Sequence, residues 1–504
     1  MSDMHVLPVI IVGGGPTGLA TALELTRQGV RVRIFDQSPH ANTESRGTGL
    51  QARTLELLDL YDASEEILAR SNRAKAFITF RHGEEIGRID FTLAAPRFGG
   101  SPVLPQAITE DILRNRLAAA GVAVEFGIQV GAIDRAAEQC TVHATDAAGR
   151  PIAAAARWVV GADGARSVVR TLLDLPFDGV SYPEGWGLMD ATLDWPLAAD
   201  AVRVFRGDGP QQFVVVPLGG DQYRLQLDHR ADAVQAAAPD VAEMQAAYDR
   251  YVPHPGSISA PAWRSSFRVH RRQVVAYRDG RVLLAGDAAH IHTPAGAQGL
   301  NTGIQDGINL GWKLALVASG KADAALLESY QDERKPIAAG VLQLAEVLAR
   351  NPEAMLGDGS VPPEILSARV GQLFVSYRDG PLAQAPTDRT GPVAGDRLPD
   401  VEIGGAWLYS RLRPGGIVVA VFGGGTDIAS LAVAWGGAIR IWHVDADDPE
   451  GVLATALGLS AGAAVIRPDG YLGAIVAGGA PSGAIGTWLA ETLHLYPTVE
   501  AVVA

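Results

Sequence analysis

The chain has 504 residues, of which 47% are hydrophobic and 19% charged, and its formal net charge is −14. This length predicts two or three globular domains, and the negative charge argues against a nucleic-acid partner, which would need a basic patch. No uncharged apolar run of about 18 residues occurs, so we expect no membrane span. The single cysteine, Cys140, excludes an intrachain disulfide and fits a cytoplasmic location; we expect it to serve in packing.

The N-terminus carries the pattern of a dinucleotide-binding turn. The apolar run at 7–12 is typical of a strand buried on both faces, and Gly13, Gly15 and Gly18 then satisfy G-x-G-x-x-G before a helical stretch. A second strand follows, and Asp36 ends it. In such a turn the first glycine permits tight bending, the second lets a pyrophosphate approach the backbone, and the third lets helix and strand pack closely. The acid can accept hydrogen bonds from ribose hydroxyls. Asp36 would repel a 2′-phosphate, which favours FAD or NAD over NADP.

Two kinds of site are compatible with residues 281–306, a metal site or a cofactor-binding loop. The stretch reads RVLLAGDAAHIHTPAGAQGLNTGIQD. Asp287, His290 and His292 are too few to form a convincing metal cage, so we expect no metal and interpret the histidines as packing residues. A buried strand ends at Asp287, and the glycine-rich segment 294–301 leads into a long amphipathic helix. That arrangement presents backbone N–H groups to an anion or oxyanion.

Composition and periodicity divide the chain into domains. Strand candidates with turn signals succeed each other through 175–275 and predict an antiparallel sheet inserted into a dinucleotide domain formed by 1–174 and 276–350. Proline, glycine and aspartate are frequent in 351–395, which is typical of a linker. In 396–504 strands and helices alternate, which predicts a small α/β domain.

Three motifs in order resemble the FAD-dependent aromatic hydroxylases, the class A flavoprotein monooxygenases, and especially their phenol-hydroxylase and polyketide-hydroxylase branch. They are GGGPTG with Asp36, GADGARSVVR at 161–170, and the Gly-Asp segment at 285–315. The resemblance implies an α/β fold: a glutathione-reductase-like Rossmann domain that binds FAD, with an inserted antiparallel-sheet substrate domain and a C-terminal thioredoxin-like domain. No CxxC is present, so thiol redox activity of that last domain is excluded.

The resemblance also assigns residues to the cofactor. The backbone of Gly299, Leu300 and Asn301, together with Pro294, is expected beside the flavin ring, and Arg166 is expected to help dock NAD(P)H. No side chain can be chosen as a catalytic acid or base. The full set expected to bind FAD is Gly13, Gly15, Pro16, Thr17, Gly18, Asp36, Gln37, Arg46, Gln106, Val130, Asp163, Gly286, Asp287, Pro294, Gly299, Leu300 and Asn301.

The activity that the resemblance implies is hydroxylation of a phenolic or polycyclic aromatic substrate by NAD(P)H and O2 through a C4a-hydroperoxyflavin, with NADPH the expected donor. Baeyer–Villiger or ring-opening oxygenation on the same scaffold is an open alternative, and a non-catalytic FAD-binding interaction protein is a remote one. The expected partner is a small aromatic molecule, and a homodimer is possible. One strand face and two nearby aromatic residues either line the substrate pocket or form sheet core: Trp186, Phe213, Val215, Pro217 and Tyr223.

Overall fold

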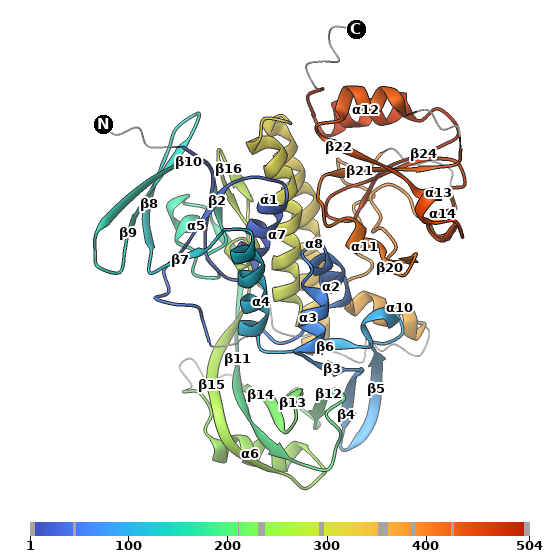
Figure 1. Cartoon of the computed structure of the whole chain (residues 1–504). Coiled ribbons are helices and arrows are strands. Elements are labelled where there is room, and N and C mark those ends of the chain that lie inside the picture. The colour runs from blue at the N-terminus through green and yellow to red at the C-terminus, as the bar shows by residue number, and fades with distance from the viewer. Residues whose placement is uncertain are drawn as a thin grey trace.

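The computed structural model describes residues 6–43, 47–209, 211–229, 237–291, 297–350, 361–384, 390–424 and 428–497. Three parts are distinguishable in Figure 1: a central helix-rich part, a large curved sheet below it, and a smaller sheet with helices at the C-terminal end. No helix within these ranges is both long and apolar enough to cross a bilayer.

The central part is built on a mixed sheet whose parallel strands follow the order β17-β10-β1-β2-β7. Four consecutive residues of its first strand, Val9 to Val12, are buried, as expected for a strand covered on both faces. The elements are β1 (Leu7–Val12), α1 (Pro16–Arg27), β2 (Val32–Asp36), α2 (Ala52–Asp59), α3 (Ser64–Ala69), α4 (Gln106–Ala119), β7 (Val124–Phe126), β8 (Gln129–Arg135), β9 (Cys140–Thr145), β10 (Pro151–Gly161), α5 (Val168–Leu172), β16 (Arg278–Asp279), β17 (Val282–Leu284), α7 (Gln298–Ala318) and α8 (Glu328–Arg350).

The curved sheet has eight strands in the order β18-β15-β11-β14-β13-β12-β4-β5. One face of this sheet is covered by α6 (Val241–Tyr251), which packs on it through Met244 and Tyr248. The strands are β4 (Ala76–Arg81), β5 (Glu84–Asp90), β11 (Phe177–Asp194), β12 (Ala201–Arg206), β13 (Gln212–Gly219), β14 (Gln222–His229), β15 (Ser257–Val274) and β18 (His290–Ile291).

The domain boundaries expected from the sequence need one correction. The strands β4 and β5 lie inside the segment 1–174, yet β4 pairs in parallel with β12 and so extends the curved sheet. A short ribbon of β3 (Asn72–Ala74) and β6 (Ser101–Val103) connects this hairpin to the central part. Since β4 and β12 are far apart in sequence, no local pattern reveals their pairing.

The segment expected to be a linker also contains ordered structure. Its helix α10 (Pro363–Val370) packs near β5 through Leu366 and Val370, and the carbonyl of Gly371 accepts a 3.0 Å hydrogen bond from Arg53 N. The described residues 363–371 therefore pack on the central part and the curved sheet rather than forming a free spacer.

The C-terminal part contains a four-stranded sheet in the order β22-β21-β23-β24, with β21 parallel to β22 and antiparallel to β23. We propose that it is the thioredoxin-like unit expected from the resemblance, because its strands and helices alternate around this sheet. The elements are β19 (Glu402–Ile403), β20 (Ala406–Trp407), α11 (Leu408–Arg411), β21 (Ile417–Phe422), α12 (Ala429–Trp435), β22 (Ile439–His443), α13 (Val444–Asp447), α14 (Val452–Leu457), β23 (Gly462–Ile466), β24 (Leu472–Ala477) and α15 (Ser482–Thr487).

A buried ionic cluster joins the C-terminal part to the central helices. Glu333 of α8 binds Arg467 through both carboxylate oxygens, at 2.6 and 2.8 Å, and accepts a 2.8 Å bond from Lys313 Nζ of α7. Arg467 also binds Asp469 at 2.7 Å, and all four side chains are 0–2% exposed. Buried charges are tolerated only when they are paired in this way, so the cluster fixes how the two parts contact each other.

Candidate functional site: a cavity for a flavin dinucleotide

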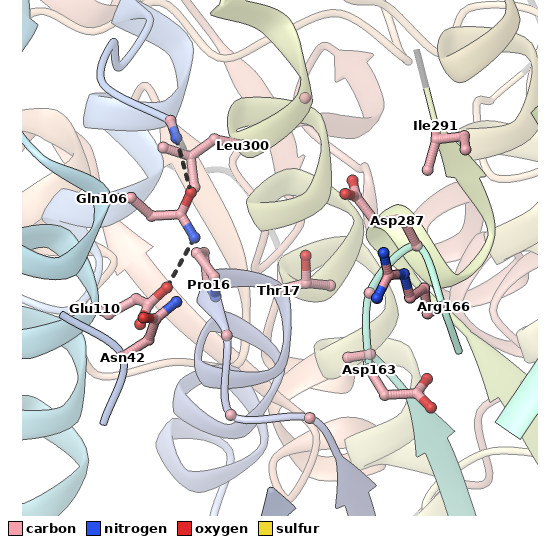
Figure 2. Close-up of a pocket in the computed structure, with 18 of the residues that line it drawn as sticks. Pro16, Thr17, Asn42, Gln106, Glu110, Asp163, Arg166, Asp287, Ile291 and Leu300 are labelled. Carbon is pink, nitrogen blue, oxygen red and sulfur yellow. Dashed lines mark hydrogen bonds between the residues drawn. The ribbon is translucent and has the colours of Figure 1, made fainter. Parts of the chain in front are cut away.

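A cavity of about 980 Å³ lies between the central part and the curved sheet. Pro16 and Thr17 of α1 and Leu300 of α7 lie at this cavity (Figure 2). The strands β11, β14 and β15 supply further lining residues. Of the residues expected to bind the cofactor, those that line it are Gly13, Gly15, Pro16, Thr17, Asp36, Gln37, Gln106, Val130, Asp163, Asp287, Gly299 and Leu300. Gly18, Gly286 and Asn301 lie directly behind this lining and are buried.

The glycine-rich turn has the geometry that a pyrophosphate requires. Gly13 has φ of +110°, and a Cβ there would lie 2.2 Å from the carbonyl oxygen of Ala162. A Cβ at Gly18 would lie 2.0 Å from the Gly13 carbonyl oxygen, so this position permits the close approach of helix and strand. At Gly15 the space is open, which leaves the backbone accessible from the cavity at the N-terminus of α1.

Asp36 closes this turn from the end of β2. Its carboxylate accepts hydrogen bonds from Gly14 N at 2.7 Å and from Ser38 N at 2.8 Å. A carboxylate has lone pairs for about four hydrogen bonds, so Asp36 still has capacity for ribose hydroxyls while it holds the turn in place.

The start of α7 lines the cavity at the end opposite the glycine turn. Gly299 and Leu300 line the cavity within the first helical turn, whose N–H groups have no partner inside the helix. The Asn301 side chain faces away: it accepts from Gln51 N at 2.8 Å and donates to Gly49 O at 3.0 Å. Asn301 therefore ties the 47–51 segment to α7 rather than presenting its amide to a ligand.

Asp287 lies at the carboxyl end of β17, where its side chain is exposed to the cavity. The preceding Gly286 has φ of +59°, and a Cβ there would lie 2.4 Å from Thr17 Oγ1 of α1. Gly286 N donates to the buried carboxylate of Asp306 at 3.2 Å. The Gly-Asp turn is thus fixed between α1 and α7, with Asp287 directed outward to the cavity.

His290 is a buried packing residue, as the sequence indicated. Its Nε2 lies 2.6 Å from Asp306 Oδ2, and Asp306 also accepts a 2.6 Å bond from Arg334 Nε. Burial would raise the pKa of Asp306, yet Arg334 and His290 together lower it, so the carboxylate stays charged. Among the residues that the structure describes, no group of three potential metal ligands exists; His292 lies outside them.

Gln106 joins α4 to the loop that follows β2. Its Oε1 accepts a 3.1 Å bond from Gly47 N, and its Nε2 donates to Glu110 at 2.8 Å (Figure 2). Burial raises the pKa of Glu110 despite the opposing effects of Gln106 and Arg114. Gln106 therefore orders one wall of the cavity; Arg46 and Pro294, also expected near the cofactor, lie outside the described residues.

The second motif divides its roles between structure and binding. Asp163 accepts bonds from Ser167 Oγ at 2.5 Å and Val168 N at 2.7 Å, so its side chain anchors the start of α5. Burial raises its pKa, and these hydrogen bonds oppose the change. Arg166, in contrast, is exposed and projects into the cavity on the side of Asp287 (Figure 2).

A group of basic residues on β15 was missed from the sequence. Arg268, His270 and Arg272 alternate along the strand and line the cavity. Ser181 of β11 lies 2.9 Å from His270 Nδ1 and 2.8 Å from Arg272 Nη2. Burial lowers the pKa of His270, and Arg272 and Arg268 lower it further. The signal in the sequence was the alternation of three basic residues along one predicted strand.

The sequence left two alternatives for one face of β13, a substrate pocket or sheet core, and the structure places that face in the sheet core. Phe213, Val215 and Tyr223 pack beneath α6 in a buried cluster with Met244 and Tyr248 and do not line the cavity. Every residue from Gln212 to Pro217 is buried, so alternation along β13 could not reveal which face meets the ligand. Trp186 packs on the opposite face of the sheet with Val214 and Val216 and is buried. Neither Trp186 nor Pro217 lines the cavity. The sheet residues that do are Phe177, Leu188, Gln226, Ser266, Phe267, Arg268, Val269, His270, Arg272 and Ile291.

These features fit a dinucleotide bound in the cavity between α1, α7 and the curved sheet. The chain matches the family described as FAD binding domain over residues 6–345. It is 34% identical to 6-methylpretetramide 4-monooxygenase of Streptomyces rimosus, over 97% of this chain and 94% of that protein. It is 32% identical to pentachlorophenol 4-monooxygenase of Sphingobium chlorophenolicum, over 78% of this chain and 76% of that one.

Solved structures agree with these relatives. The OxyS anhydrotetracycline hydroxylase from Streptomyces rimosus has a TM-score of 0.80 at 30% identity, covering 98% of this chain and 100% of that chain. The ternary complex of aklavinone-11 hydroxylase with FAD and aklavinone has a TM-score of 0.78 at 25% identity, with the same coverage. The chain therefore belongs to the FAD binding domain family, and it is an FAD-dependent aromatic monooxygenase, as the sequence motifs predicted.

Proposed function

We propose that the protein hydroxylates a polycyclic phenolic substrate and that the residues described above hold its FAD. One observation carries this proposal: a single cavity of about 980 Å³ runs from the glycine turn of α1 to Leu188 and Phe267 on the curved sheet. The cavity is at the upper end of the roughly 300–1,000 Å³ range of small-molecule sites. It extends past the dinucleotide motifs to the curved sheet, which supports a place for a second molecule beside the cofactor.

The two ends of the cavity have separate roles in this proposal. The N–H groups around Gly15 would hold the pyrophosphate, and Asp36 would accept hydrogen bonds from the adenosine ribose hydroxyls. The backbone of Gly299 and Leu300 would hold the flavin ring, and the positive end of the α7 dipole there would stabilise negative charge on it. When bound, FAD supplies the chemistry of hydride acceptance from a nicotinamide donor and of O2 activation.

The substrate is proposed to bind between the first turn of α7 and the curved sheet. Leu188, Phe267 and Val269 form an apolar surface there, which excludes water from the reacting atoms. Gln226 adds one polar amide to that surface and can bond to an oxygen substituent of the ring. Similarity to enzymes named for tetracycline intermediates supports a polycyclic molecule.

The nicotinamide donor is proposed to dock on the basic side of the cavity. Arg166, Arg268 and Arg272 lie on its lining, and guanidinium groups bind phosphates in bidentate geometry. NADPH, with its additional phosphate, is the proposed donor. We further propose a cytoplasmic location and retain a homodimer as the proposed assembly.

Oxidation of NADPH by the purified holoenzyme tests the function. Simple phenols, naphthols and polycyclic aromatic polyketides would be supplied in turn, and products analysed by mass and NMR. We expect stimulation by polycyclic phenols and a product with one added hydroxyl on an intact carbon skeleton. A product with an inserted ring oxygen would establish Baeyer–Villiger oxygenation instead, and no stimulation by any aromatic compound would favour a non-catalytic protein.

A further inference from the structure

A chain of buried amides supports the first turn of α7 from behind. Gln372 Nε2 donates to Gln298 Oε1 at 2.5 Å, and Gln372 Oε1 accepts from Gln305 Nε2 at 2.5 Å. Gln305 also donates to Thr54 Oγ1 at 3.3 Å. Gln298 is the residue directly before Gly299 and Leu300 on the cavity lining, so the amide chain ends at the turn expected to face the flavin.

Gln372 itself is held in an uncommon backbone conformation. Its φ is +60°, in the left-handed region, and its side chain is buried, with 5% of the residue exposed. Such a conformation is unfavourable in a residue other than glycine and persists only where surrounding contacts impose it. Here the neighbouring Gly371 carbonyl is bonded to Arg53 N of α2 at 3.0 Å, which fixes this segment to the central part.

The hydrogen bonds run in one consistent direction. Gln305 donates to Gln372, Gln372 donates to Gln298, and Gln298 Nε2 donates to Val370 O at 3.5 Å. A primary amide is the side chain that both accepts and donates at this length, so no apolar or carboxylate side chain at position 372 reproduces the pattern. Because protein interiors are rigid and closely packed, loss of this bridge is transmitted to the adjoining turn.

We infer that Gln372 is a positioning residue for the flavin: acting through Gln298, it fixes the Gly299–Leu300 turn against the isoalloxazine ring. The segment after α10 is thereby part of the cofactor site although it touches no ligand. This inference rests on the proposed contact between that turn and the flavin.

The test uses the full-length protein and three readouts: the Kd for FAD from quenching of flavin fluorescence, the visible absorption band of bound FAD, and thermal unfolding of the apoprotein. Gln372→Met removes the amide at similar volume. Gln372→Gly removes it while relieving the left-handed backbone. Gln384→Met is the matched control, since Gln384 accepts a bond from Ile475 N of β24 in the C-terminal contact.

Both Gln372 variants are expected to raise the Kd for FAD about tenfold, equal to 1.4 kcal/mol, and to shift the visible band. Gln384→Met should lower the unfolding temperature without either change. Wild-type affinity and spectrum in both Gln372 variants would overturn the inference, even with reduced stability. Leu300→Trp separates this from the proposed function: if a much larger side chain on this turn leaves both the flavin band and the Kd for FAD unchanged, the turn does not contact the flavin.

Discussion

Thr17 of α1 lies so close to Gly303 of α7 that no side chain fits between the two helices. A Cβ at Gly303 would lie 2.4 Å from Thr17 Oγ1, and a Cβ at Gly307 would lie 2.6 Å from the Thr17 carbonyl oxygen. The first turns of both helices face the cavity. Their crossing therefore sets the distance between the two halves of the proposed FAD site, the pyrophosphate site at the start of α1 and the flavin-ring site at the start of α7.

Gly303→Ala is expected to weaken FAD binding and to destabilise the apoprotein by about 1–3 kcal/mol, the usual cost of overpacking. Fluorescence titration with FAD and thermal unfolding measure the two effects. Gly340→Ala is the control, because Gly340 lies in α8 with open space around its Cβ position. That change should stabilise by about 0.5–1 kcal/mol, as alanine does in a helix. Unchanged FAD affinity in Gly303→Ala would show that the crossing tolerates expansion.

Arg166→Met and Arg272→Met are expected to raise the KM for NADPH about fivefold each at low salt, with little change in kcat or FAD affinity. The physical reason is loss of a charge on the cavity side proposed to meet the donor's phosphates, and such attraction is screened as salt increases. Steady-state kinetics at two ionic strengths measure the effect. Arg88→Met on β5, where Arg88 pairs with Glu85 at 2.8 Å, serves as the control. Equal KM values in all three variants would place the donor elsewhere.

Leu188→Trp is expected to abolish stimulation by polycyclic phenols while retaining FAD, because the larger side chain fills the cavity beside the sheet. Tyr223→Phe is the matched change on the opposite face, beneath α6. It should leave the substrate KM within about twofold of the wild type. A large KM change in Tyr223→Phe with none in Leu188→Trp would instead assign the substrate to the face of β13 beneath α6, the pocket alternative that the sequence left open.

The sequence predicted best where function imposes local spacing. Gly13 and Gly18 lie at the turn between β1 and α1, and Asp36 closes that turn from the end of β2. Their contacts follow from steric limits that operate within one strand–helix–strand unit. Asp287 likewise follows a buried strand directly, so its position at the carboxyl end of that strand was predictable.

Features that depend on pairing between distant segments were not predictable. The hairpin β4–β5 joins the curved sheet only through β12, and Gln372 reaches Gln298 from a segment with the composition of a linker. The strand β13 illustrates a second limit. Because Phe213 and Val214 are both buried, on opposite faces, hydrophobic alternation contains no information about which face meets the cavity.

Glu333→Gln is expected to destabilise the protein by roughly 3–5 kcal/mol, since it leaves Arg467 and Lys313 buried with too little negative charge. Burial would raise the pKa of Glu333, but Arg467 and Lys313 lower it to about 2. The folded-state pKa is thus below the ordinary value of 4.5, so the stabilisation is complete above that pH and is lost as pH falls through about 2.

The measurement is the difference in unfolding temperature between wild type and Glu333→Gln at pH 7, 5 and 3. This difference should be largest at pH 7 and 5 and should have begun to shrink at pH 3, because there the unfolded wild type takes up a proton that the folded state resists. Glu85→Gln is the control: its pair with Arg88 is exposed, so it should cost less than about 1 kcal/mol. A difference that stays constant down to pH 3 would mean that Glu333 is not held ionised by Arg467 and Lys313, and that the two parts of the chain are joined chiefly by their apolar contacts.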